Sequence, residues 1–297
     1  MSGKRVLEKR LEELRHLGQA SATPETSGIL AKALADKSNL VVAQAAKAIA
    51  ALRVQSLVPD LIAAFERLLQ DGAASDPQCR AKLAIINTLK SIEHADSAIF
   101  LRGMSHIQWE PVWGGQEDTA AQLRGTCALA LVQCRGLTRE RILQHLVDAF
   151  TDRAESVRAD AARALEQIEG HEHALLLRFK ARIGDAKSRV TGQVLESLLN
   201  LEGAEAIPFI KEFLNSGESE VSEEAALVLA ASRLPQALSA LTHAWSEHRN
   251  RPNADFFLRA IALSRLPEAA AFLENLIQNG VEREAKAAKK AIEASNR

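Results

Sequence analysis

The sequence predicts an all-α protein, an α-solenoid of about eight helical hairpins in a right-handed superhelix. Three observations lead to this prediction. A helix-turn-helix unit occupies residues 146–169, and comparable units begin at intervals of 31 to 42 residues along the chain. The tetrapeptide Ser-Arg-Leu-Pro at 232–235 also returns at 264–267. Self-similarity at such periods indicates a helical-repeat array, here expected to form a single domain over residues 1–297.

The second helix of the unit at 146–169 carries small and apolar residues on one face. Helical spacing brings together Val157, Ala161, Ala164, Leu165 and Ile168. Asp152 precedes this helix, where a short acceptor side chain can cap free N–H groups. One such unit cannot bury its apolar faces alone, so it must stack on neighbouring copies.

The copies are found by fixing the capping position and requiring an apolar residue thirteen places later. This register gives eight pairs: Asp36 and Ile49, Asp76 and Leu89, Asp118 and Leu131, Asp152 and Leu165, Asp185 and Leu198, Ser216 and Leu229, His248 and Ile261, Asn279 and Ile292. The last two pairs, which begin at His248 and Asn279, are the most degenerate copies. The register therefore covers nearly the whole chain.

The units resemble the HEAT-repeat family. The resemblance rests on an Asp and an Arg six residues apart, at Asp118 and Arg124 and at Asp152 and Arg158, and on Ala-Ala pairs and early prolines at 59 and 208. An Asp and an Arg at this spacing can link neighbouring units along a ladder. We expect less regular stacking in the copies without this Arg, which have Val42, Thr191, Ser222 and Ala254 at that position.

The elements follow in order from an N-terminal cap. A charged amphipathic helix at 4–18, within a cap at 1–20, is expected to cover the first repeat, since terminal units of arrays need a polar outer face. Repeats one to three are expected at 24–53, 56–93 and 95–134, followed by compact repeats and a final charged helix at 282–295. Repeat three contains an inserted loop at 103–118.

Composition limits the classes of partner. Charged residues make up 25 % of the chain and the net charge is −1, so there is no overall attraction to nucleic acid or an anionic membrane. No apolar run approaches the ~20 residues of a membrane span, and the charged N-terminus has no apolar signal core. We therefore expect a cytoplasmic protein with no membrane association.

Motifs for catalysis or metal binding are missing from the sequence. There is no phosphate-binding loop, nucleophile elbow or His-Glu-x-x-His helix, and the three cysteines form no Cys-x-x-Cys pair. His171 and His173 are the only close histidines, without an evident third ligand, so we interpret them as part of a solvated turn. We expect no cofactor, no metal and no catalytic residue.

The insertion at 103–118 is one candidate site. It contains Trp109, Glu110 and Trp113, with the two indoles four residues apart around a proline. Long irregular segments in compact repeats are often functional, so the pair could clamp a ligand or partner. Trp is also usually largely buried, so both indoles could instead fold back over the gap between repeats two and three.

The concave surface is the other candidate. Residues opposite the predicted core show no continuous basic stripe, which makes nucleic-acid binding unlikely. The middle is partly apolar, with glycines at 125 and 192 and with Leu129, Leu199 and Leu227, while Arg163, Glu196 and Arg259 add charge. These residues form an apolar groove unless the array curves tightly enough for neighbouring helices to cover them.

Two hypotheses about function follow. The first is a non-enzymatic scaffold that holds a protein or peptide partner in the concave groove, through the leucines, the three charged residues and the tryptophan insertion. The alternative is a HEAT-like enzyme or small-ligand module, resembling alkylpurine DNA glycosylases or bilin lyases. A broad positive basin around Trp109 would favour the glycosylase-like alternative, whereas an apolar trough would favour the scaffold.

Overall fold

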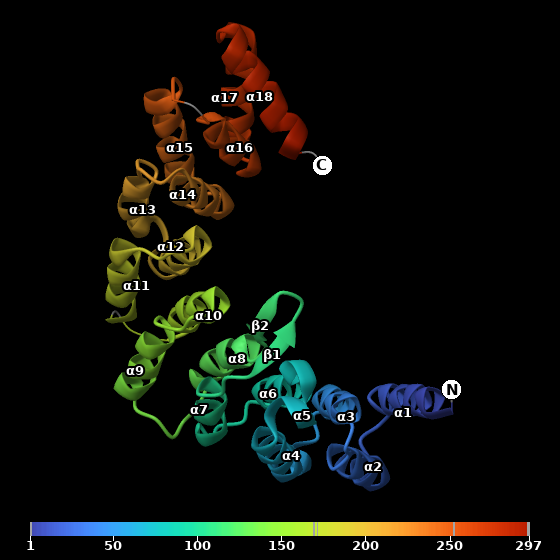
Figure 1. Ribbon diagram of the computed structural model, residues 1–297. Coiled ribbons are helices and arrows are strands. Elements are labelled where there is room, and N and C mark those ends of the chain that lie inside the picture. The colour runs from blue at the N-terminus through green and yellow to red at the C-terminus, as the bar shows by residue number, and fades with distance from the viewer. Residues whose placement is uncertain (1, 169, 171, 252, 296–297) are drawn as a thin grey trace. The chain divides into compact units, whose positions relative to one another are not determined.

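A computed structural model describes residues 2–168, 170, 172–251 and 253–295. Within these ranges the chain is almost entirely helical, with one two-stranded β-hairpin (Figure 1). The predicted all-α solenoid is therefore confirmed. The chain forms two compact units, residues 1–164 and 165–297, and each is described by itself. The expectation of one continuous domain and the handedness of the array stay predictions.

Unit 1 contains a first row of helices that pack in succession. Helix α1 (Ser2–Leu17) packs on α3 (Asn39–Leu52), α3 packs on α6 (Arg80–Ser91), and α6 packs on α8 (Ala121–Leu131). A second row covers them: α2 (Pro24–Leu34) lies on α3, α4 (Val58–Gln70) on α6, and α7 (Ala98–Met104) on α8. The short elements η1 (Gln55–Leu57), α5 (Gly72–Ser75) and η2 (Pro77–Cys79) connect the rows.

The last pair of unit 1 consists of α9 (Arg139–Ala149), which contacts α8, and α10 (Glu155–Glu166). Unit 2 repeats the same alternation. Its successive helices α12 (Ser188–Glu202), α14 (Ser219–Ser232), α16 (Asp255–Leu263) and α18 (Glu282–Ser295) pair with α11 (Glu172–Ile183), α13 (Ile207–Phe213), α15 (Pro235–His248) and α17 (Pro267–Asn279). The turn η3 (Gly203–Ala206) precedes α13. Proline occupies the first turn of α4, α13, α15 and α17, where its missing N–H costs nothing.

The thirteen-residue register identifies the core correctly. Seven of the eight predicted core residues are buried: Ile49, Leu89, Leu131, Leu165, Leu198, Leu229 and Ile261. The eighth, Ile292, is only half-buried, because Ala288 and Ala291 fill the core side of α18 instead. Alanines such as Ala45, Ala46, Ala161 and Ala164 are also fully buried, which lets neighbouring helices approach closely.

Five of the eight predicted capping residues act in the turn before the helix, whereas Asp76 caps α6 as predicted, by accepting from the N–H groups of Ala81 and Lys82. Four of them accept a hydrogen bond from the backbone N–H two residues later, in a turn that precedes the helix: Asp36, Asp152, Asp185 and Ser216. Asp118 does the same toward the N–H of Ala120. Short acceptor side chains favour such turns as strongly as caps. The sequence pattern thus located the turn, and the helix begins a few residues later.

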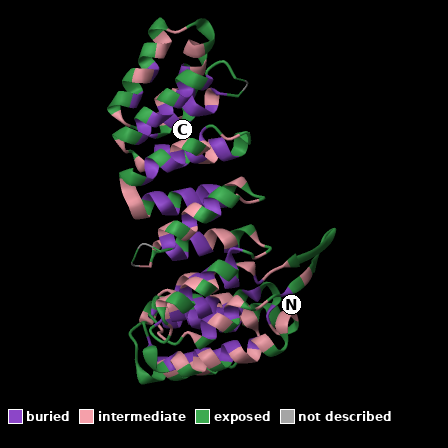
Figure 2. Cartoon of the chain, turned by 90° about the vertical axis from the view of Figure 1, so that its left-hand side faces the viewer, coloured by how far each residue is buried: buried purple, intermediate pink, exposed green. Residues whose placement is uncertain are grey.

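The segment 103–118 is not an irregular loop. Gly103 and Met104 complete α7, and strands β1 (Trp109–Val112) and β2 (Gly115–Asp118) pair antiparallel, with Trp109 opposite Asp118. Gly114 has a φ of 89°, a left-handed conformation that glycine adopts without strain and that closes the two-residue turn. Figure 2 shows the hairpin projecting from the helices of unit 1 with most of its surface exposed.

Replacing Leu165 by Asp should lower the free energy of unfolding by about 3–5 kcal/mol, because an unpaired charge would enter the core. Ser156→Asp, at an exposed position of α10, is the matched control and should change stability by under about 0.5 kcal/mol. Urea unfolding of both variants measures the difference. Equal stabilities would show that the register is wrong.

Candidate functional site

The tip of the hairpin exposes large apolar side chains. Trp113 is fully exposed at 103 % of its reference surface, and Trp109 is 49 % exposed. Val112 is also exposed. Val112 and Trp113 lie at the turn, and we call them the hairpin tip, whereas Trp109 lies at the other end of β1, opposite Asp118. Trp245, in contrast, is buried within α15, as its place in an amphipathic helix predicts. The alternative in which both indoles fold back onto the helices is therefore wrong for Trp113.

The base of the hairpin is held by hydrogen bonds to Glu110. Its carboxylate accepts from the Thr119 hydroxyl, the Gln108 side-chain amide and the Gln78 backbone N–H, each at 2.6 Å. Partial burial raises the pKa of Glu110, but these three donors outweigh burial and hold the pKa below its usual value. Glu110 is therefore ionised and anchors the hairpin, and its carboxylate is already hydrogen-bonded to groups of the same chain.

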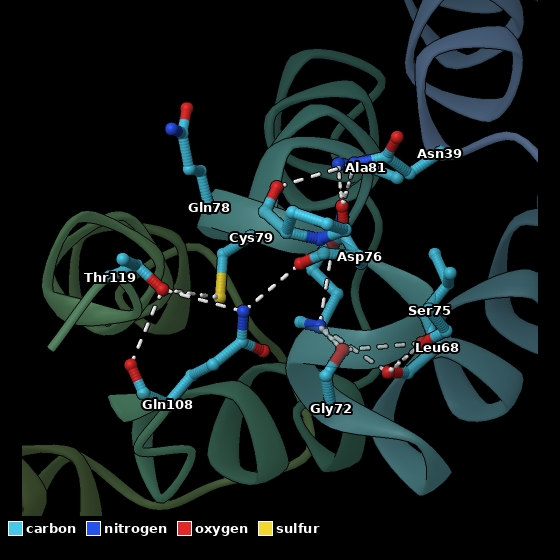
Figure 3. Close-up of polar contacts among 12 residues, drawn as sticks. Asn39, Leu68, Gly72, Ser75, Asp76, Gln78, Cys79, Ala81, Gln108 and Thr119 are labelled. Carbon is cyan, nitrogen blue, oxygen red and sulfur yellow. Dashed lines mark hydrogen bonds and ion pairs between the residues drawn. The ribbon is translucent and has the colours of Figure 1, made fainter. Parts of the chain in front are cut away.

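Gln108 joins the hairpin to the turn before α6. Its buried side-chain amide donates to the carbonyl of Asp76 at 3.0 Å, 32 residues away in sequence (Figure 3). The backbone carbonyl of Gln108 accepts a hydrogen bond from the backbone N–H of Thr119 at 2.9 Å. Because buried amides strongly require partners, Gln108 fixes the position of β1 relative to α6.

Asp76 is the centre of a fully buried polar network (Figure 3). Its carboxylate accepts from the N–H groups of Ala81 and Lys82 and from the Asn39 side chain, each at 2.9 Å. The Lys82 ammonium lies 3.4 Å from the same carboxylate and has no exposed surface. It also donates to the carbonyl of Leu68 at 3.3 Å. A buried ion pair is tolerated only when such additional hydrogen bonds satisfy both charges.

The turn before α6 holds two consecutive residues in the left-handed region. Gln78 has a φ of 62° and Cys79 a φ of 51°, and neither is glycine. Such conformations cost of order 1 kcal/mol each and persist where surrounding contacts determine them. Burial raises the pKa of the Cys79 thiol to about 11, so the thiol stays protonated and is a poor nucleophile. The strained turn is therefore a structural support for the hairpin.

The Asp and Arg ladder exists between two neighbouring repeats. Arg124 binds Asp118 of its own repeat at 2.7 Å and both carboxylate oxygens of Asp152 of the next repeat at 2.7 and 2.9 Å. Burial raises the pKa of Asp152, but the hydrogen bonds from Arg124 outweigh it and lower the pKa. Arg158 donates to the backbone carbonyls of Asp152 and Arg153.

The other predicted site residues separate into two groups. In unit 1, Leu129 is partly exposed on α8, and Arg163 is exposed on α10, where it binds Asp160 at 2.7 Å. In unit 2, Glu196 is exposed on α12, but Leu199 is only 6 % exposed. Leu199 is therefore a core residue of unit 2, and its assignment as an exposed anchor is wrong.

Leu227 and Arg259 meet at one small cavity. Leu227 is 45 % exposed and, with Arg259, Phe256 and Leu263, lines a cavity of about 180 Å³ among α14, α16 and α18. These two residues therefore lie on one surface of unit 2, and their role in binding stays a prediction. The sequence predicted a small apolar surface at Gly125 and Gly192. Carboxylates cover both glycines instead: Asp160 lies over Gly125, and Glu224 lies over Gly192.

The sequence analysis missed the residues that support the hairpin: Asn39, Lys82, Gln108 and Thr119. One signal could have identified Lys82. Asp76 and Lys82 have the same six-residue spacing as Asp118 and Arg124, with Lys in place of Arg. Asn39 and Gln108 contact Asp76 across 37 and 32 residues of sequence, and no local pattern marks them. Thr119 contacts Glu110 only because the hairpin brings its two ends together.

Neither a candidate metal centre nor a membrane-spanning helix is present among the described residues. In the part of the chain that the structure describes, no three His, Cys, Asp or Glu side chains gather as a metal ion would require. His171 lies outside the described residues, so its pairing with His173 stays untested. None of the described helices combines the length and apolar character needed to cross a lipid bilayer.

Fold and site together define an all-α helical-repeat protein with an inserted β-hairpin. No protein-family model matches the chain, and no curated protein matches it. Solved structures similar to it include YibA of Escherichia coli, at 16 % identity over 97 % of both chains with a TM-score of 0.47.

Two further solved structures show weaker likeness. Human deoxyhypusine hydroxylase in complex with glycerol is 18 % identical, over 98 % of this chain and 100 % of that chain, with a TM-score of 0.29. An engineered protein is 15 % identical, over 98 % and 96 % of the two chains, with a TM-score of 0.33. At TM-scores this low none of the three carries an argument about activity, so function is argued from the chain's own residues.

Replacing Lys82 by Met should lower the free energy of unfolding by about 3–5 kcal/mol, because Asp76 would remain charged and buried without its cation. The double variant Asp76→Asn with Lys82→Met should lose less than the sum of the two single changes. Lys90→Met, on the same helix but partly exposed, is the control. Strictly additive losses would contradict a coupled pair.

The contribution of Asp152 to stability should depend on pH. Because its pKa is lowered in the folded chain, the stabilisation is fully present above the unfolded value of about 3.9 and is lost as pH falls through the folded pKa. The stability difference between the wild type and Asp152→Asn should therefore shrink between pH 5 and pH 2. Urea unfolding across this range measures it, and a constant difference would refute the role of the ion pair.

Proposed function

We propose that this chain is a non-enzymatic scaffold that binds a protein or peptide partner through its hairpin tip. The observation that carries the proposal is the contrast between the two ends of the hairpin. Its base is fixed by the hydrogen bonds of Glu110 and Gln108, whereas Trp113 at the tip is left in water. Trp109, at the base, is half-exposed. A rigid, exposed aromatic pair loses little conformational entropy on binding and supplies large apolar area, as interface hot spots do.

The charges of the hairpin favour a protein partner over nucleic acid. Its charged residues, Glu110, Glu117 and Asp118, are all acidic, and phosphate groups would be repelled from them. A positive basin around Trp109 would have favoured the glycosylase-like alternative. The acidic residues of the hairpin do not support that alternative. Leu129 and Arg163 in unit 1, and Glu196, Leu227 and Arg259 in unit 2, remain candidate secondary contacts.

We also infer that the repeats are of the HEAT type, supported by the ladder of Asp118, Arg124 and Asp152. A cytoplasmic location is part of the same proposal, since a reducing compartment suits three buried free thiols. Neither statement is needed for the hairpin to act as a binding element.

Replacing Trp109 and Trp113 together by Ala should weaken partner binding by at least about 30-fold, equivalent to about 2 kcal/mol, if the tip is a hot spot. Affinity capture from the source organism identifies the partner, and titration with that purified partner measures the dissociation constants. Phe179→Ala, at an exposed position of α11, is the control and should bind as the wild type does.

Thermal melts of the same double variant distinguish binding from structure. Because Trp113 is fully exposed, its removal leaves no cavity, and the double change should cost under about 1 kcal/mol of stability. A loss of about 3–5 kcal/mol would show that the indoles are structural, as buried large-to-small changes are. Unchanged affinity for the partner would also refute the proposal.

A further inference from the structure

Helix α1 is a first-row helix that lacks a second-row partner. In unit 1 each of α3, α6 and α8 is packed against a second-row helix, namely α2, α4 and α7. Among residues 2–164, α1 makes its extensive contact with α3 alone. The position beside α2 and against α1, which a further second-row helix would occupy, is therefore vacant in the described part of unit 1 (Figure 1).

A groove of about 670 Å³ lies at this vacant position. Its floor is apolar, with Leu14 and Leu17 from α1 and Ile29 and Ala33 from α2. Ile29 is 41 % exposed although it belongs to the face of α2 that faces the groove. Val6, four residues before Arg10 and so on the same face of α1, is also exposed and extends the apolar strip by one turn.

The rim of the groove is mostly basic. Arg10 and His16 line it from α1, and Lys32 lines it from α2. Glu13 is the one carboxylate among the lining residues. Arg10 binds Asp36 at 2.5 Å and keeps its side chain half-exposed. A partner with carboxylates beside its apolar face would complement Arg10 and Lys32, whereas a basic partner would be repelled.

We propose that this groove binds an amphipathic helix of a protein partner, with the apolar face of that helix on Leu17 and Ile29 and its carboxylates beside Lys32 and Arg10. The repeat geometry defines the shape of the occupant, because α3, α6 and α8 are each covered by a helix at the equivalent place. Binding of a helix in a groove uses the same spacing of apolar anchors that packs these repeats. The groove is separate from the hairpin tip, so either proposal can fail alone.

A peptide of residues 58–70 is a suitable probe, because α4 occupies the equivalent place on α6. It buries Leu61, Phe65 and Leu68 there and carries carboxylates at Asp60 and Glu66. Short isolated helices are marginal in water, so the peptide is held helical by a hydrocarbon staple between positions 59 and 63, both exposed in α4. Fluorescence anisotropy of the labelled peptide is followed while the full chain is added.

The wild type should bind with a dissociation constant on the order of 10–100 μM, a value typical of one short apolar helix face. Ile29→Glu should weaken binding at least about tenfold, because a charge would enter the apolar floor. Lys32→Glu should weaken binding about threefold, with a smaller salt dependence. Lys47→Glu, on the exposed side of α3, is the matched control and should bind as the wild type does.

Three results would overturn the proposal. These are absence of binding by the wild type, equal binding by Ile29→Glu, and equal weakening by Lys47→Glu. A peptide with Phe65→Asp that still binds would count in the same way, since it has lost its central anchor. Sedimentation velocity is run in parallel: a dimer of the wild type that Ile29→Glu dissociates would assign the groove to a second copy of the chain.

Discussion

The structure depends on one constraint, which is that a helical pair with apolar residues on more than one face cannot bury them by itself. Each pair must stack on the next, so the buried residues recur at the same place in every repeat, from Ile49 to Ile261. Stacking at this distance requires small residues in the contact, and fully buried alanines supply them. The same constraint explains why a first-row helix without a partner leaves an apolar groove.

Polar groups then fix how the repeats of unit 1 are aligned. Apolar stacking is not directional, so helices could slide along one another with little change in buried area. Arg124 prevents this by binding carboxylates of two repeats at once, and Asp76 does so by accepting from Asn39 of the preceding repeat. Both interactions lie where solvent is largely excluded, so breaking them leaves charges without partners. Alignment of these repeats therefore rests on few residues.

The hairpin uses this rigid frame to present apolar side chains to solvent. Its base is joined through Gln108 and Glu110 to the turn that carries Asp76, so the strands inherit the fixed position of α6. An isolated two-stranded hairpin is marginally stable in water. Anchoring by hydrogen bonds at the base allows the tip to carry Trp113, which is fully exposed and contributes nothing to the core. The separation of anchor and tip is what makes the hairpin suitable for recognition.

The sequence by itself determined the repeat register, the turn positions and the helical character of the chain. These follow from local spacing, because the faces of a helix and the acceptor residue before it are set by neighbours within a few positions. The pairing of Arg124 with Asp152 was also predictable, since the same motif occurs in both repeats. The insertion was recognised as a candidate site because of its length and its two tryptophans.

Only the tertiary structure decided which of the candidate residues are accessible. Leu199 and Leu227 were both predicted to be exposed anchors, yet the first is buried and the second exposed, because burial depends on what packs over each side chain. The hairpin was not predictable, since its strands are stabilised by Asp76, Gln78 and Thr119, which act from other elements. The groove beside α1 could not be predicted either, because it is formed by the packing of α1 and α2 and no sequence pattern marks it.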